Sequence, residues 1–112
     1  MDPQKKMMQT TIYVGLNDQE TGIQKFDTEK YLSILKNVCR SYQVAFSVQL
    51  IQGGYFHEDG RYTNENTLSL MLIDVPENTV NEIAKDLCMF FNQESVMVTA
   101  SPSAVYFVQE RL

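Results

Sequence analysis

The stretch QGGYFHEDGRYTNENT, residues 52–67, decides how the chain folds, because it has the pattern of the centre of a β-hairpin. The flanking segments 44–52 and 66–74 alternate apolar and polar residues, as half-buried strands do. Asp59-Gly60 is a strong turn signal, since glycine tolerates the positive φ that tight hairpin turns require. We therefore predict a long hairpin that reverses near residues 58–61, with a solvated tip.

The segments outside the hairpin complete two β-α-β halves. Residues 10–16 alternate as a strand. Two segments carry apolar stripes at helical spacing, residues 26–42 and 78–92. Residues 94–100 and 104–109 are expected to be two strands that Pro102 separates. This order predicts an α+β fold, a ferredoxin-like βαββαβ sandwich: an antiparallel sheet with two helices on one face and an extra short C-terminal strand.

The domain organisation is expected to be simple. At 112 residues the chain can bury a core without metals or disulfides. Residues 1–9 are expected to form a flexible tail and residues 10–112 a single domain. Asp27 or Thr28 should cap the first helix, and Thr79 begins a capping-box spacing at the second.

Charge and cysteine content limit the partners and the compartment. The formal net charge is −5, and residues 57–112 carry nine acids against three bases. This acidic half argues against nucleic acid and against an anionic membrane as partners. We expect it to serve solubility; the alternative is an acidic surface for a basic protein partner. No apolar run reaches the ~20 residues that span a bilayer, and no secretory signal is visible. Cys39 and Cys88 lie far apart among apolar neighbours, as free thiols in a reducing cytoplasm do.

The chain contains few residues for catalysis or metal binding. His57 is the one histidine, so a Ser or Cys nucleophile would depend on it. Zinc needs about four Cys or His ligands at close spacing, and no such cluster is present. We therefore expect no metal, no cofactor and no catalytic constellation. We expect His57 to be an exposed residue of the hairpin. The alternative is a site for a small polar ligand, formed by Tyr55, His57, Tyr62, Glu65 and Glu94.

The sheet face that the helices leave uncovered is a candidate interface. Its apolar members are expected to cluster, and such a patch often marks an association surface. The residues expected there are Tyr13, Ile51, Met71, Ile73, Met97 and Tyr106. We predict a homodimer through this open face, in the manner of a dimeric α+β barrel. Alternatively, residues 104–112 fold back over part of it.

Three segments together resemble an uncharacterised bacterial domain-of-unknown-function family. They are IYVGLN (12–17), GGYFHEDGRYTNENTLSLML (53–72) and FNQESVMVTASPSAVYF (91–107), and the QESV segment is the most specific. Many members carry an export signal and a Pro-Arg-Phe segment after the first helix, and this chain has neither. The resemblance implies a shared fold and assigns no catalytic residue.

Three functions remain open at this point, one of them a structural accessory subunit that associates with a larger assembly through an edge strand. The leading hypothesis is a non-enzymatic, acidic binding module that recognises a protein or a small ligand, one form being a phage or mobile-element inhibitor of a basic host protein. The alternative is a small metal-free enzyme of the dimeric-barrel type that acts on a small organic substrate, with His57 or a tyrosine as acid or base.

Overall fold

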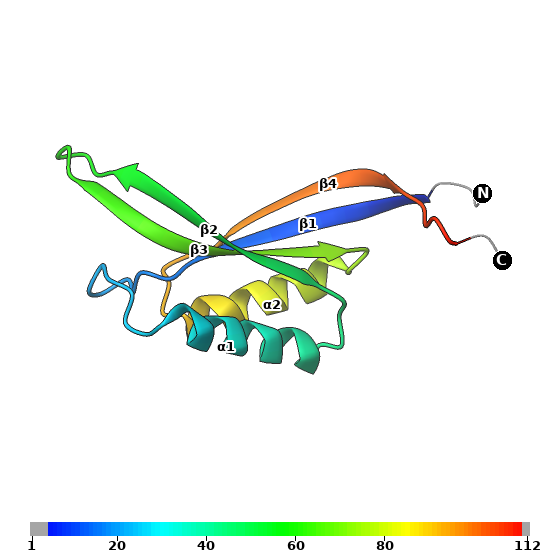
Figure 1. The fold of residues 1–112 in the computed structure, drawn as a ribbon, viewed down its shortest axis with the longest axis horizontal. Coiled ribbons are helices and arrows are strands. Elements are labelled where there is room, and N and C mark those ends of the chain that lie inside the picture. Colours follow the sequence, from blue (N-terminus) through cyan, green and yellow to red (C-terminus); the bar gives the residue numbers. More distant parts are fainter. Residues whose placement is uncertain (1–4, 111–112) are drawn as a thin grey trace.

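The computed structural model describes residues 5–110 and contains six elements. They are β1 (Lys5–Gly15), α1 (Thr28–Ser41), β2 (Ser47–Phe56), β3 (Tyr62–Ile73), α2 (Glu77–Phe90) and β4 (Met97–Val105). The strands form one antiparallel sheet in the order β2-β3-β1-β4, and both helices lie on the same side of it (Figure 1). The ferredoxin-like α+β fold predicted from the sequence is confirmed.

The core lies between the helices and the central strands. Alternate residues of β1 and β3 point toward the helices, and each helix buries one stripe against them. Fully buried residues are Ile12, Val14 and Leu16 of β1 and its end, Leu35 and Cys39 of α1, Leu70 and Leu72 of β3, and Ile83 and Leu87 of α2. Odd-numbered residues of β1, β2 and β3 therefore lie on the opposite side, which we call the open face.

The helix starts confirm one expectation and correct another. The Asp27 carboxylate accepts a hydrogen bond from the Lys30 backbone N–H at 3.1 Å, so Asp27 caps α1 as predicted. Helix α2 begins at Glu77, with Pro76 before it and no side-chain cap. The expected cap at Thr79 is wrong, because Pro76 is the N-cap residue and the helix begins at Glu77, so Thr79 lies within the first turn.

Strand β4 is continuous through Pro102, so the expected break and the separate short C-terminal strand are wrong. Pro102 pairs with Met8 of β1, and the Met8 carbonyl accepts the Asp74 backbone N–H at 2.9 Å. Met8 therefore directs its backbone polar groups toward β3, and the opposite residue, Pro102, directs its own away from β1. Proline lacks an N–H, but none is needed at this position of the ladder.

Strand β1 starts earlier than the sequence indicated. Residues 5–9 of the expected tail pair with β4, from Lys5 opposite Val105 to Gln9 opposite Ser101. Residues 1–4 and 111–112 lie outside the described part of the chain. The β1–β4 pair and the β2–β3 hairpin project as two arms beyond the helices, at opposite ends of a molecule of 56 × 30 × 28 Å (Figure 1).

Candidate functional site

The tip of the β2–β3 hairpin is a turn, as predicted. The His57 N–H donates to the Arg61 carbonyl at 2.8 Å, and Gly60 has the positive φ, 89°, that the turn requires. The Asp59 carboxylate accepts hydrogen bonds from the Arg61 backbone N–H and guanidinium, and both bonds lower the pKa of Asp59. Its neighbour Glu58 is exposed. The charged groups of the tip therefore stabilise the turn.

The two stems of the hairpin divide the expected ligand residues between the two sides of the sheet. Glu65 pairs with Gly53 and Thr63 pairs with Tyr55, and these four residues belong to the open face. Tyr62 lies on the side of the helices, where its ring packs on Phe56 at 5.0 Å between centroids. The structure thus groups Tyr55 with Glu65, as predicted, but separates Tyr62 from them, because residues three apart in a strand point to opposite faces.

The aromatic part of the site is formed by Tyr55 and His57. Their ring centroids are 5.1 Å apart with planes tilted by 58°. The His57 Nε2 atom lies 2.8 Å from the Thr63 hydroxyl, which fixes the imidazole. Tyr55 is 44% exposed, so one aromatic surface remains open to solvent on the open face.

The Glu65 carboxylate is half-buried and held in place. Its Oε2 atom accepts the Asn17 backbone N–H at 3.1 Å. The carboxylate also lies over Gly15, where a Cβ would approach Oε2 to 2.5 Å. Across the ladder, a Cβ at Gly53 would meet nothing within 4 Å. Two glycines therefore flank the carboxylate: Gly15 makes room for the side chain itself, and Gly53 leaves open space beside it.

The loop after β1 is tied to the loop after α2. The Gln93 side-chain amide donates to the Asn17 carbonyl at 2.6 Å, and the side-chain amide of Asn17 donates to the Asn64 carbonyl at 3.1 Å. Glu94, the next residue in the chain, is exposed, and no contact joins it to Glu65 within residues 5–110. The sequence did not identify Asn17 or Gly15; a glycine inside a strand was the available signal for a close approach.

Asp18 strengthens the same junction. Its carboxylate accepts a hydrogen bond from the Asn92 amide at 2.7 Å and lies 3.3 Å from the Lys25 ammonium. The side chain is only 6% exposed. The Asn92 hydrogen bond, with those from the Glu20 and Thr21 backbone, lowers the pKa of Asp18 from 3.8 to about 2. Asp18 thus remains ionised and joins the two loops beside Glu65.

The open face is less apolar than the sequence indicated. The residues expected at an interface are Tyr13, Ile51, Met71, Ile73, Met97 and Tyr106, and all but Tyr106, which follows the end of β4, lie on this face. Their neighbours across the ladder are mostly polar; Met71, for example, lies between Thr11 and Ser47. A hollow of about 300 Å³ in its centre is lined by Gln9, Thr11, Tyr13, Ser47, Val48, Gln49, Ser69 and Met71.

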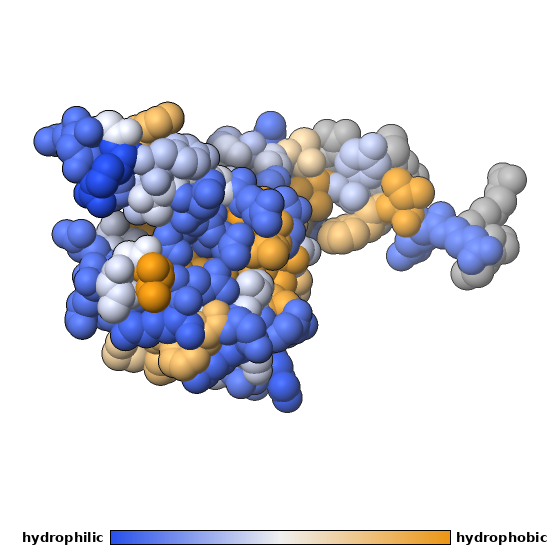
Figure 2. Space-filling view, turned by 60° about the vertical axis from the view of Figure 1, so that its left-hand side comes forward, coloured by the Kyte–Doolittle hydropathy of each residue, from blue (hydrophilic) through white to orange (hydrophobic). Residues whose placement is uncertain are grey.

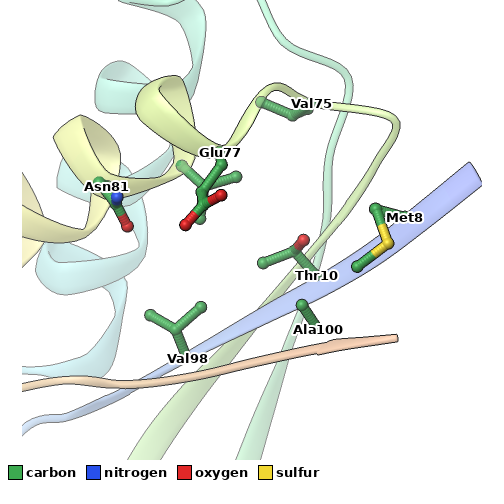
Figure 3. A pocket seen from close by; sticks show the side chains of 8 residues that line it. Met8, Thr10, Val75, Glu77, Asn81, Val98 and Ala100 are labelled. Carbon is green, nitrogen blue, oxygen red and sulfur yellow. The ribbon is translucent and has the colours of Figure 1, made fainter. Parts of the chain in front are cut away.

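A second hollow, on the side of the helices, has a different character (Figure 3). Its volume is about 300 Å³, and its lining is Met8, Thr10, Val75, Glu77, Val80, Asn81, Val98 and Ala100. Glu77 and Asn81 of α2 point over an aliphatic floor from β1 and β4. Among these eight residues Glu77 alone is titratable, so the hollow holds no acid–base pair. It lies on the other face of the sheet from Glu65 and near the opposite end of β1.

The remaining surface carries both polar and apolar side chains, and Phe56, Phe107 and Val108 are each more than 70% exposed. Figure 2 shows both kinds of side chain on one side, with apolar residues gathered mainly where the body meets the arm that carries the termini. Within residues 5–110 no helix is long and apolar enough to cross a membrane. In the same range no group of three or more His, Cys, Asp or Glu side chains is placed to hold a metal ion.

Comparison with known proteins identifies similar folds. No family model matches the chain, and no curated protein is significantly similar in sequence. A phage SAM lyase in complex with S-methyl-5'-thioadenosine superposes with a TM-score of 0.67 at 18% identity, over 94% of this chain and 93% of that chain. GlnK of B. subtilis in complex with ATP gives 0.58 at 13% identity over 88% and 82%. The periplasmic divalent cation tolerance protein CutA from Archaeoglobus fulgidus gives 0.55 at 11% over 93% and 87%. At these identities the similarity establishes the fold alone.

Proposed function

We propose that the protein binds S-adenosylmethionine on the open face beside Glu65 and cleaves it as a lyase, releasing S-methyl-5'-thioadenosine. The observation that carries this proposal is the Glu65 carboxylate, fixed by Asn17 on the same hairpin and the same open face as the exposed aromatic pair of Tyr55 and His57. The similarity in fold to the phage SAM lyase, over more than nine-tenths of both chains, supports it.

The chemistry of this ligand matches the site. S-adenosylmethionine combines a flat purine with two cations, a sulfonium and an α-ammonium. Purines stack on aromatic rings, so Tyr55 and His57 offer a surface for the adenine. Glu65 offers a carboxylate for one of the cations, with Gly53 leaving room beside it. The net charge of −5 favours the approach of a cationic ligand.

Cleavage of this substrate makes a modest chemical demand on the protein. When the bond between sulfur and the γ-carbon breaks, both bonding electrons remain on sulfur, which becomes a neutral thioether. The substrate's own carboxylate can form the new bond to that carbon and close a lactone, so no water or side-chain nucleophile is consumed. The positive charge on sulfur disappears in this step, and a carboxylate paired with it would stabilise the reactant more than the transition state. We therefore assign Glu65 to the α-ammonium, whose charge does not change.

The test is incubation of the purified protein with S-adenosylmethionine, followed by chromatography for S-methyl-5'-thioadenosine. We expect the product with the wild-type protein and a loss of at least about 100-fold in rate for Glu65→Gln, since the carboxylate that orients the substrate is neutralised. Glu58→Gln, an exposed carboxamide substitution on the same hairpin, should retain full activity. Absence of product with the wild-type protein would refute the lyase.

A non-enzymatic binding module is the second candidate. One observation favours it: Glu65 bonds to a backbone amide and His57 to a threonine hydroxyl, so the site holds no acid–base pair. Such a module would bind the adenosine ligand without converting it, and calorimetry together with the chromatographic assay separates the two. In its inhibitor form, the module would bind a basic protein with strong salt dependence.

A homodimer through the open face fits either function. Binding sites for small molecules usually cover most of the ligand surface. Tyr55 and Glu65 lie on a projecting arm with only one wall, but on the same face as Tyr13 and Met71. Association of two copies through this face would place a second wall over the ligand.

A further inference from the structure

We infer that Gln93, in the loop after α2, is a positioning residue for Glu65 and acts through the backbone of Asn17. The inference rests on the proposed function, because it assigns Gln93 a part in binding the amino-acid portion of the same ligand. Gln93 belongs to the QESV segment, and it contacts neither Tyr55 nor Glu65 directly in the described chain. Its influence would therefore pass through one residue.

Asn17 lies just beyond the last hydrogen bond between β1 and β3. The β1–β3 ladder ends with Gly15 opposite Thr67, followed by one more hydrogen bond from the Leu16 N–H to the Asn66 carbonyl. Beyond that point a backbone bridge pairs Asn17 with Gln24. Two side chains also bond to Asn17: the Glu65 carboxylate accepts its N–H at 3.1 Å, and the Gln93 amide donates to its carbonyl at 2.6 Å. Gln93 is thus one of the groups that fix the backbone of Asn17, whose N–H holds the Glu65 carboxylate.

Gln93 is itself firmly held, as a positioning residue must be. Its backbone N–H donates to the Cys88 carbonyl at 2.9 Å, and its carbonyl accepts the Cys88 thiol at 3.0 Å. Its side-chain amide makes a second contact with the Phe91 carbonyl at 3.3 Å. The end of α2 thus holds Gln93 in place, the Gln93 side-chain amide bonds to the Asn17 carbonyl, and the Asn17 N–H bonds to the Glu65 carboxylate.

The arrangement predicts which ligands will sense Gln93. S-adenosylhomocysteine retains the α-ammonium but has no sulfonium to cleave, so it reports binding without turnover. S-methyl-5'-thioadenosine lacks the amino-acid portion altogether. Loss of Gln93 should weaken binding of the first ligand and leave the second unchanged, which a general loosening of the fold would not do.

The experiment is calorimetry with both ligands on Gln93→Ala, Glu65→Gln and the double variant. We expect Gln93→Ala to weaken S-adenosylhomocysteine binding by about 5-fold to 10-fold, the effect of one hydrogen bond. The double variant should bind no more weakly than Glu65→Gln alone. Gln19→Ala is the matched control, because it removes another amide hydrogen bond, to Asn92 at 2.9 Å, between the same two loops. Additive effects, or equal weakening with both ligands, would overturn the inference.

An NMR measurement separates failure of the positioning from failure of the proposed function. The Asn17 amide proton should resonate downfield while it donates to a carboxylate, and should move upfield in Glu65→Gln and in Gln93→Ala but not in Gln19→Ala. If wild-type protein binds neither nucleoside, the proposed function fails, and the Asn17 resonance still decides the positioning. An Asn17 resonance that Gln93→Ala leaves unmoved refutes the role of Gln93.

Discussion

Tyr55 and Tyr62 lie on opposite sides of the β2–β3 hairpin, although both are exposed tyrosines on the stems of the same turn. Tyr55 shares the open face with Glu65. Tyr62 packs against Phe56, and its hydroxyl fills the space over Gly54. The two residues are therefore a matched pair for testing which side of the hairpin binds a ligand.

We predict that Tyr55→Ala weakens binding of S-methyl-5'-thioadenosine by about 10-fold or more, because stacking of a base on an aromatic ring contributes about 1–3 kcal/mol. Tyr62→Ala should leave the affinity within about 2-fold of wild type. Calorimetry on the two variants gives the comparison. A larger loss for Tyr62→Ala would place the ligand on the side of the helices.

Gly15 is expected to be indispensable to the geometry of Glu65. In Gly15→Ala the new methyl group would lie 2.5 Å from the Glu65 Oε2 atom, so the carboxylate must move and release the Asn17 N–H. Because the displaced atoms are the end of a flexible side chain, we expect the free energy of unfolding to fall only by about the 0.5–1.5 kcal/mol of the lost hydrogen bond, and we expect loss of S-adenosylmethionine cleavage. Gly53→Ala is the control for stability, since its methyl group meets open space; urea denaturation should show it unchanged within about 0.5 kcal/mol.

The loop junction at Asp18 should make the fold sensitive to acid. The folded-state pKa of Asp18 is lowered to about 2 from 3.8, so its stabilisation is complete above pH 4 and disappears as the pH falls toward 2. Urea midpoints measured between pH 7 and pH 2 should fall for the wild-type protein over that window. Asp18→Asn should begin lower and lose less across it.

Asp59→Asn controls for the general effect of carboxylate titration. The Asp59 side chain is 57% exposed, so its ion pair with Arg61 stabilises the fold only weakly, and the variant should follow the wild-type curve. A wild-type profile that remains flat from pH 4 to pH 2 would contradict the role of Asp18.

The two cysteines should differ in reactivity. Both are free, as the sequence predicted, but Cys39 is buried and burial raises its pKa to about 11, whereas Cys88 is partly exposed. At pH 8 a disulfide reagent should label one thiol per native chain and two in denaturant. Cys88→Ser should remove the native reaction and Cys39→Ser should preserve it; the reverse result would contradict the packing of α1.

Association through the open face can be tested by introducing a negative charge into that face. If two copies pair there, Met71→Glu and Ile73→Glu should yield a monomer by light scattering, because each buries an unpaired carboxylate. Met89→Glu, at a methionine 65% exposed on α2, is the control and should leave the mass unchanged. A monomeric wild-type protein at tens of micromolar would refute the homodimer.

Local periodicity predicted most of the fold. The alternation of residues 10–16, 44–52 and 66–74 and the two helical stripes predicted five of the six elements in order, because burial on one face imposes those periods. The two-residue period of a strand also predicts the side on which Tyr62 lies: Tyr62 and Glu65 are three residues apart, so they point to opposite faces of the sheet. The break predicted at Pro102 was wrong because a strand accepts a proline where no N–H is needed. Whether one is needed depends on the direction of the Met8 carbonyl opposite, which only the strand register determines.

The site could be predicted only in part. Tyr55, His57 and Glu65 lie on one hairpin, so a single turn brings them together. Gln93 and Asn17 are 76 positions apart and meet through loops whose conformation no local pattern specifies. Glu94, which the sequence analysis placed at the site, is exposed, and its uncharged neighbour Gln93 makes the contact with Asn17.

The orientation of Pro102 has a consequence for how copies of the protein can add to one another. A strand edge normally recruits further strands through alternating donors and acceptors, and at the outer side of β4 one donor is missing near the middle. Strand β2, at the other edge of the sheet, has no proline among Ser47–Phe56. Addition of a further strand at the β4 edge would thus be disfavoured. Because repeated edge-to-edge addition needs both edges of the sheet, Pro102 opposes growth of the protein into a fibre.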